Sequence, residues 1–311
     1  MITITKSSPL SCITLPLARP FLRPLLWIKN LYGRWSSRSD ANSHSAISQL
    51  GNVDHKWRRK IDTVLSSEDN AAIPRVPDAG RLDGGLITMH NGIQVSALGY
   101  YGGGILNMLV ENRGVHEPQE ERAFAVILGL LEPGATMIEL GAYWGFYSLW
   151  FAKEVHDARC HLVEPSYACM LSGKQNFKRA NQDAAFTQAY VGSEEGISLD
   201  GTNIICVDDY CRKHALDKVD ILHVDIQGAE EMMLKGAESM LKERKVDYIF
   251  ISTHSNGLHS NCVKALKDYG YEILASANMD DSYSGDGLIV ARSPFLTNPL
   301  KIEISHRTKR V

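Results

Sequence analysis

The sequence lacks long apolar runs and clustered cysteines. No stretch reaches 18 consecutive apolar residues, so no membrane-spanning helix is predicted. The six cysteines form no C-x-x-C pair and no repeated spacing, which disfavours a disulfide framework and a structural zinc site. We therefore expect reduced thiols and a cytoplasmic location.

Basic charge is also scarce over most of the chain. The net charge of −3 disfavours a nucleic-acid partner, because such a partner requires a basic surface. The first 39 residues nevertheless carry six basic side chains and no acid, interleaved with apolar residues such as Phe21 and Trp27. This pattern leaves two alternatives, a solvated arm or peripheral membrane contact through residues 15–35.

Composition divides the chain into four parts. Hydrophobic residues make up 44% and charged residues 22%, as in ordinary globular proteins. We expect a basic, disordered arm at residues 1–45, a small α+β segment at 46–115 that covers the substrate site, a main domain at 116–293 and a C-terminal tail at 294–311. Within the α+β segment, a helix is expected at Val53–Leu65.

Asn91-Gly92 predicts a hairpin in the same segment, because this pair favours tight turns between strands. The two strands are expected at Leu86–Met89 and Ile93–Ala97.

The main domain alternates strand and helix patterns, which predicts an α/β fold with a mostly parallel sheet and helices on both faces. The expected strands are Thr136–Leu140, His161–Val163, Ala185–Tyr190, Ile204-Ile205, Val219–Val224, Tyr248–Ile251, Tyr271–Ala275 and Leu288–Ala291. The expected helices are Glu120–Leu131, Phe146–Val155, Ser166–Asn181, Asp208–His214, Glu230–Lys242 and His259–Tyr269. A loop, not a helix, joins the last two strands, unlike a nucleotide-dependent oxidoreductase.

A glycine loop follows the first strand of this domain. Glycine lets the backbone turn and approach a ligand closely, and the amides that open the next helix can bind an anion. The E-x-G-x-x-x-G spacing differs from the G-x-G-x-x-G of dinucleotide sites, which disfavours NAD or FAD. The cofactor-binding residues expected here are Glu139, Gly141, Ala142, Tyr143 and Gly145.

Acidic residues close the next strands. Glu164, followed by Pro165, ends the second strand, where an acid can bind ribose hydroxyls. The alternative role for Glu164 is to cap the following helix. Asp225 ends a later strand and is assigned to both cofactor binding and catalysis.

His254 follows the neighbouring strand, where it could remove a proton from a hydroxyl group. The alternative is a loop histidine that only forms hydrogen bonds. A divalent metal held by His223, Asp225 and His254 is disfavoured because no second carboxylate is identified nearby, so no metal is assigned.

Together these motifs resemble the FkbM-type methyltransferases over residues 112–293. The resemblance rests on the glycine loop, Glu164-Pro165, the segment Asp225-Ile-Gln-Gly-Ala-Glu230 and the upstream His116-Glu117-Pro118-Gln119-Glu120. It implies a class I, Rossmann-like fold of seven strands with an antiparallel last strand, and S-adenosylmethionine as cofactor. It also implies methyl transfer to oxygen, commonly on a sugar or secondary metabolite, and hence a small-molecule or glycan acceptor.

The sequence departs from the family pattern at two positions. Gln227 stands where an acid is common, and His223 stands where lysine is more frequent. Glutamine cannot act as a base, so a non-catalytic cofactor-binding module remains an alternative.

Overall fold

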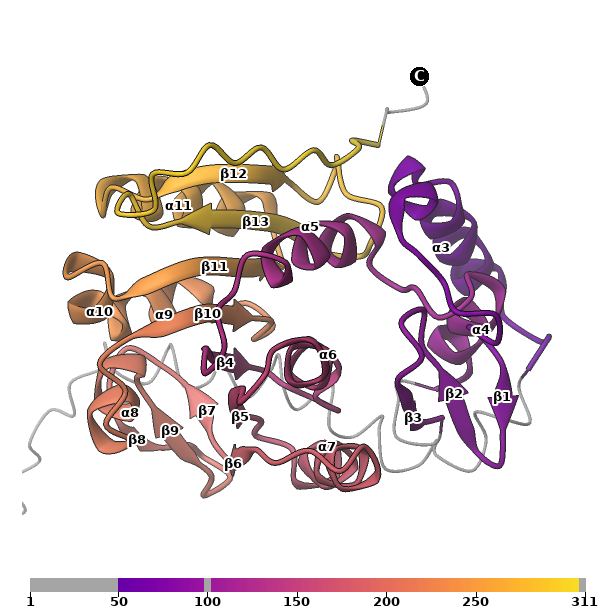
Figure 1. Ribbon diagram of the computed structural model, residues 1–311, viewed down its shortest axis with the longest axis horizontal. Helices are drawn as coiled ribbons and strands as arrows, with labels where there is room; N and C mark the ends of the chain where they lie inside the picture. The colour runs from indigo at the N-terminus through magenta and orange to yellow at the C-terminus, as the bar shows by residue number, and fades with distance from the viewer. Residues whose placement is uncertain (1–49, 98–101, 308–311) are drawn as a thin grey trace, which may run out of the picture.

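The computed structural model describes residues 50–97 and 102–307, and its centre is a seven-stranded sheet (Figure 1). The sheet order is β12-β13-β11-β10-β4-β5-β6. The strands are β4 (Thr136–Leu140), β5 (Arg159–Val163), β6 (Ala185–Thr187), β10 (Val219–Val224), β11 (Val246–Thr253), β12 (Glu272–Ala277) and β13 (Gly287–Arg292). The order reverses between β4 and β10, which makes their carboxyl ends a favoured place for a ligand.

Strand direction confirms the predicted fold class. The pairs β4–β5, β5–β6, β4–β10 and β10–β11 are parallel, whereas β13 runs antiparallel to both β11 and β12. The last strand, β13, lies antiparallel between β11 and β12. This order gives the sheet the class I methyltransferase arrangement.

Helices cover both faces of the sheet (Figure 1). One face packs against α5 (Pro118–Leu128), α6 (Phe146–Glu154) and α7 (Tyr167–Arg179), and the other against α8 (Val207–Lys213), α9 (Glu230–Gly236), α10 (Glu238–Lys242) and α11 (Asn256–Asp268). Successive strand residues point to opposite faces, so Met137 belongs to the first core and Ile138 to the second. Both faces are therefore buried, as the apolar strands predicted.

The N-terminal segment stands beside the first face. It comprises α3 (His55–Leu65), the 3-10 helix η1 (Glu68–Ala72), the strands β1 (Leu82–Asp83), β2 (Leu86–Thr88) and β3 (Gln94–Ser96), and α4 (Gly103–Glu111). The helix expected at Val53–Leu65 and the antiparallel hairpin around Asn91-Gly92 are confirmed.

Helix α4 was not predicted, because two glycines open it and glycine disfavours helices. A Cβ at Gly104 would lie 2.1 Å from a ring carbon of Trp57, so this glycine lets Trp57 pack directly on α4.

The strand predicted at Ala185–Tyr190 is wrong as a single element. β6 ends at Thr187, and the chain then enters a separate three-stranded sheet of β7 (Tyr190–Val191), β9 (Asn203–Ile205) and β8 (Gly196–Ile197). Tyr190 pairs with Ile204, so the strand expected at Ile204-Ile205 also belongs to this smaller sheet. A continuous apolar pattern cannot show which of two sheets each residue joins.

The helix predicted at Glu230–Lys242 is broken at Ala237. The Asp208 carboxylate accepts hydrogen bonds from the backbone N–H groups of Ser239 and Met240, at 2.8 and 3.0 Å. Asp208 therefore caps a new helix start from a distant point in the sequence.

The segment after β13 returns to the N-terminal segment. The buried Asp69 carboxylate accepts hydrogen bonds from Ser305 N, at 3.0 Å, and from Arg122 Nη1, at 2.8 Å. Gln119 Nε2 donates to the Ser305 carbonyl at 2.6 Å. Residues of η1, α5 and the C-terminal segment thus meet at one point.

The predictions for the basic arm, including membrane contact through residues 15–35, lie outside the described residues. Over the described ranges, the structure contains no helix with the length and apolar character needed to cross a membrane.

Candidate active site

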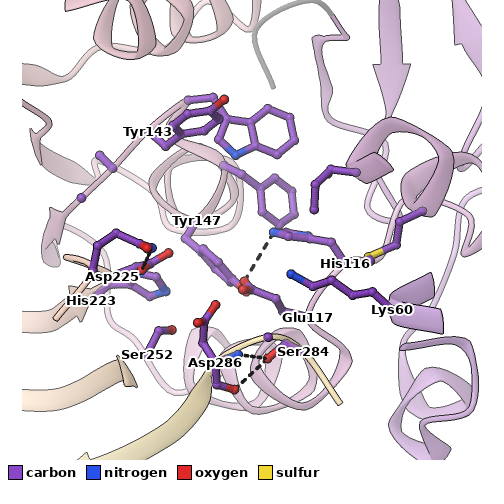
Figure 2. Close-up of a pocket in the computed structure, with 18 of the residues that line it drawn as sticks. Lys60, His116, Glu117, Tyr143, Tyr147, His223, Asp225, Ser252, Ser284 and Asp286 are labelled. Atoms are coloured by element: carbon purple, nitrogen blue, oxygen red, sulfur yellow. Dashed lines mark hydrogen bonds and ion pairs between the residues drawn. The ribbon is translucent and has the colours of Figure 1, made fainter. Parts of the chain in front are cut away.

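A cavity of about 740 Å³ lies at the carboxyl ends of β4, β10 and β11 (Figure 2). This volume is typical of small-molecule sites. The main domain contributes Glu139, Gly141, Ala142, Tyr143, Trp144, Phe146, Tyr147, His223, Asp225, Gln227, Ser252, Ser284, Gly285 and Asp286. The N-terminal segment and the approach to α5 contribute Asp54, Lys56, Trp57, Lys60, Ile105, Met108, His116 and Glu117. The cavity thus combines the predicted cofactor loop with residues to which the sequence assigned no role.

The glycine loop is shaped by positive φ angles and by a close backbone approach. Gly141 has φ +76°, and a Cβ there would lie 1.8 Å from the Asp225 carbonyl oxygen. Only glycine allows these two loops to touch. Gly145, at φ +73°, precedes α6, and its missing Cβ faces Leu162 and Phe177. Glycine at 145 is therefore required by the protein core, and Gly145 does not line the cavity.

Glu164 supports the glycine loop from behind. Its carboxylate accepts hydrogen bonds from Tyr143 N at 2.9 Å and from Ser166 N at 2.8 Å. Burial, only partly offset by these two bonds, raises the pKa of Glu164 to about 7. Neither Glu164 nor Pro165 lines the cavity. The capping role and a role in shaping the loop are thus both visible, and ribose binding stays a prediction.

Glu139 lies beneath the same loop and lines the cavity. It accepts a hydrogen bond from Ser148 N at 3.0 Å, which joins β4 to α6. Burial raises the pKa of Glu139 to about 7.

Asp225 and His254 are brought together, as predicted, within a larger group of carboxylates. His254 Nε2 lies 3.3 Å from Asp225 Oδ1 and 3.5 Å from Asp286 Oδ1, while Nδ1 lies 2.7 Å from Glu230 Oε1. Burial alone would lower the pKa of His254, but the bonds to Asp225 and Glu230 raise it well above its ordinary value. The raised pKa favours the protonated ring, and the role of His254 as a base stays a prediction.

Asp225 stays ionised because its neighbours stabilise its negative charge. Burial would raise its pKa, but hydrogen bonds from His254 and Gln227 lower it. Gln227 Nε2 donates a hydrogen bond to Asp225 Oδ1 at 3.0 Å, whereas an ionised carboxylate at this position could not donate one. The departure from the family pattern at Gln227 therefore has a structural reason: it stabilises the Asp225 charge.

The segment before α5 places two ionisable groups in the cavity that sequence reasoning left without a role. Tyr147 donates a hydrogen bond to Glu117 Oε2 at 3.0 Å, and His116 Nε2 lies 3.4 Å from the same oxygen (Figure 2). Lys60 extends from α3 toward them (Figure 2). The motif around His116 was noticed in the sequence, but nothing in it indicated contact with the cavity.

His116 is held by Glu121, a carboxylate with no exposed surface. His116 Nδ1 lies 2.8 Å from Glu121 Oε1, and His90 Nε2 lies 3.2 Å from Glu121 Oε2. Burial would lower the pKa of His116, but the charges of Glu117 and Glu121 raise it to about 9. The same pairing offsets burial and lowers the pKa of Glu121 to about 2.

A second buried pair forms the floor of the cavity. His223 Nε2 lies 2.7 Å from Glu120 Oε1, and Ser252 donates a hydrogen bond to Glu120 Oε2 at 3.0 Å. The His223 ring packs on Tyr147, with 4.3 Å between centroids. Burial would lower the pKa of His223, but its bond to Glu120 raises it. A histidine paired with a carboxylate thus occupies the position where lysine is frequent in the family.

Within residues 50–97 and 102–307, no group of three or more His, Cys, Asp or Glu side chains is arranged to hold a metal ion.

Comparison with known proteins gives one family match. Residues 169–273 match the model described as "Methyltransferase FkbM domain". No curated protein matches the chain.

Solved structures with similarity include a precorrin-6y C5,15-methyltransferase from Geobacter metallireducens and the fibrillarin of Aeropyrum pernix, the latter in complex with S-adenosyl-L-methionine. The first is 18% identical over 56% of this chain and 87% of its own, with a TM-score of 0.39. The second is 17% identical over 54% of this chain and 73% of its own, with a TM-score of 0.38.

The family match agrees with the resemblance found in the sequence. The FkbM domain is an S-adenosylmethionine-dependent domain, so the predicted cofactor is the one that the matched domain uses. Residues 169–273 therefore match a methyltransferase FkbM domain, and they lie within a sheet that has the class I methyltransferase strand order.

Proposed function

We propose that this protein transfers a methyl group from S-adenosylmethionine to a hydroxyl group of a small molecule or glycan in the cytoplasm. The observation that carries the proposal is the single cavity in which the glycine loop of β4 faces ionisable side chains from β10, α3 and the α5 approach. The cytoplasmic part rests on cysteine chemistry: the five cysteines among the described residues are free and buried.

The residues present fit the cofactor. Gly141, Ala142 and Tyr143 present the loop to the cavity, and Glu164 fixes the Tyr143 amide from behind. The volume of about 740 Å³ leaves room for an acceptor beside a nucleoside-sized ligand. When bound, S-adenosylmethionine supplies a methyl group that is already activated by its positive sulfur.

The protein's own residues then orient the acceptor. Asp225 presents a stable negative charge to the cavity, and His254 holds that carboxylate in place through the contacts with Glu230 and Asp286. A carboxylate in this position can accept a hydrogen bond from an acceptor hydroxyl and align it, which is a large part of what methyl transfer requires.

We propose that residues 46–115 cover the acceptor site. Trp57 and Lys60 from α3, with Ile105 and Met108 from α4, form the wall opposite the glycine loop. An aromatic ring, a cation and apolar side chains suit a polar ligand with apolar faces. The two walls of the cavity come from separate parts of the chain, which supports the assignment of the acceptor to the wall formed by the N-terminal segment.

The cofactor part is tested by calorimetry with S-adenosylhomocysteine. We expect the wild-type chain to bind it. Glu164→Gln should bind it about 10- to 100-fold more weakly, because hydrogen bonds from the ribose hydroxyls to a charged carboxylate contribute about 1.5–3 kcal/mol. Glu154→Gln, on the exposed end of α6, is the matched control. Unchanged affinity in folded Glu164→Gln would refute the role of Glu164.

The reaction is tested with tritiated S-adenosylmethionine and fractionated sugar and metabolite extracts. Label in a hydroxyl-bearing product supports O-methylation. Tight binding of S-adenosylhomocysteine without any transfer would instead support the alternative of a non-catalytic binding module.

A further inference from the structure

Methylation of a hydroxyl group releases a proton, and a group in the cavity must accept it. The following inference rests on the proposed function and names that group. A proton acceptor must be unprotonated when it acts and must present a free lone pair to the cavity.

Most ionisable groups of the site do not meet these conditions. Neighbouring carboxylates raise the pKa of His254 and of His116, which favours their protonated forms. Asp225 has a lowered pKa, because its contacts with His254 and Gln227 stabilise the charged form. A carboxylate that is strongly stabilised in its charged form is a weak base.

Glu117 presents a free lone pair to the cavity by its position, and it reaches its unprotonated form as the pH rises through about 8. It is the N-cap residue of α5, its side chain is 19% exposed, and it lines the cavity at the centre of Figure 2. Tyr147 and His116 both approach Oε2, at 3.0 and 3.4 Å. Among the described residues, Oε1 has no hydrogen-bond partner, so one oxygen is held and the other is available to a ligand.

The backbone of Glu117 is also fixed. Glu121 Oε1 accepts hydrogen bonds from His116 N at 2.8 Å and from Glu117 N at 3.0 Å. The carboxyl group therefore projects from a rigid turn, as a base needs for a defined reaction geometry.

Burial, together with the charges around it, makes Glu117 a stronger base than an ordinary carboxylate. Burial has the largest effect and raises its pKa, the charge of His116 lowers it, and Glu120, Asp225 and Asp286 raise it, to about 8. Lys60 faces the same space from α3 (Figure 2). Asp286 is also raised, but it lies on a more exposed loop and pairs with His254.

We propose that Glu117 is the catalytic base that removes the proton from the acceptor hydroxyl. The hydroxyl oxygen bonds to the methyl carbon, the carbon–sulfur bond breaks with its electron pair staying on sulfur, and the hydroxyl proton moves to Glu117 Oε1. Asp225 aligns the acceptor, and Tyr147 with His116 holds the second oxygen of Glu117.

The experiment compares two cofactor analogues and needs no acceptor. S-adenosylhomocysteine is neutral where the methyl group would lie, whereas sinefungin carries an ammonium group there. A site with a carboxylate base near the point of methyl transfer should therefore bind sinefungin more tightly than S-adenosylhomocysteine. Above about pH 8, where Glu117 is charged, we expect Glu117→Gln to bind S-adenosylhomocysteine like the wild type but to lose about tenfold in affinity for sinefungin.

The pH dependence adds a second readout. Glu117 is charged only above its pKa, so the wild-type preference for sinefungin should increase as the pH rises through about 8, until the ligand's amine loses its own proton. Glu117→Gln should show no such increase, and Glu154→Gln should behave as the wild type. Because the wild-type profile alone shows the effect, the test holds even if Glu117→Gln does not fold.

The outcomes separate the two proposals. If the wild type binds neither analogue, the proposed function fails, and this inference fails with it. If both analogues bind and the preference for sinefungin is the same with and without Glu117, or is independent of pH in the wild type, only the assignment of Glu117 is overturned.

Discussion

Replacing the buried Glu121 with glutamine should reveal how the site is held together. Glu121 Oε1 accepts the two backbone amides before α5 and pairs with His116, so it links the fold to the position of Glu117. Glutamine keeps the shape and one carbonyl acceptor but removes the charge that faces His116.

The magnitude follows from the two pKa values. The pKa of Glu121 is lowered from 4.5 to about 2, which corresponds to about 3 kcal/mol of stabilisation. The pKa of His116 is raised from 6.5 to about 9 and gives a similar figure. Both values describe the same pairing, so they are not added. We expect Glu121→Gln to lower the free energy of unfolding by about 3 kcal/mol.

The sign of the pH dependence differs for the two partners. The contribution of Glu121 is present above pH 4.5 and is lost as the pH falls toward 2. The contribution of His116 is present below pH 6.5 and is lost as the pH rises through 9. The difference between wild type and Glu121→Gln should therefore be largest between pH 4.5 and 6.5.

Urea unfolding followed by tryptophan fluorescence measures this difference at several pH values. Glu243→Gln is the control, because Glu243 forms an exposed pair with Lys245 and should change stability by less than about 1 kcal/mol. A loss below about 1 kcal/mol in Glu121→Gln at pH 6, or a loss that does not depend on pH, would refute the reasoning.

Two further substitutions test other parts of the site. Gly145→Val should lower the melting temperature and the free energy of unfolding by several kcal/mol, since its Cβ would lie 2.8 Å from Leu162 at a positive φ; a normal melting curve would contradict this. His254→Asn should weaken acceptor binding, seen as a raised Michaelis constant, and the wild-type rate should show no ionisation near pH 6.5 that disappears in the variant. A rate that rises with the deprotonation of His254 near that pH would restore it as the base.

The sequence predicts the main domain well because strong local signals define it. Buried apolar strands, the glycine loop and the acids at strand ends are all read from neighbouring residues, and the fold then brings Asp225 and His254 together. The split of the strand at Ala185–Tyr190 and the break at Ala237 depend on distant partners, so local patterns could not show them.

The part of the site that the sequence missed depends on three-dimensional packing. Nothing in the pattern of α3 distinguishes Lys56 and Lys60 from its other basic residues, and only the turn of the helix decides that these two line the cavity. The raised pKa of His254 likewise depends on Asp225 and Glu230, and Glu230 lies 24 residues away in the chain. The reason for glutamine at 227 is visible only once its amide is seen beside Asp225.

The contact between Asp69 and Ser305 has a consequence for how the molecule is made. Asp69 belongs to the segment that carries the cavity wall, but the backbone amide that binds it is synthesised 236 residues later. On the ribosome, Asp69 can pair with Arg122, which is 53 residues away, long before the amide of Ser305 is made. The wall opposite the cofactor loop acquires its final support only when Ser305 has emerged, so a nascent chain can complete the nucleotide side of the cavity well before the acceptor side.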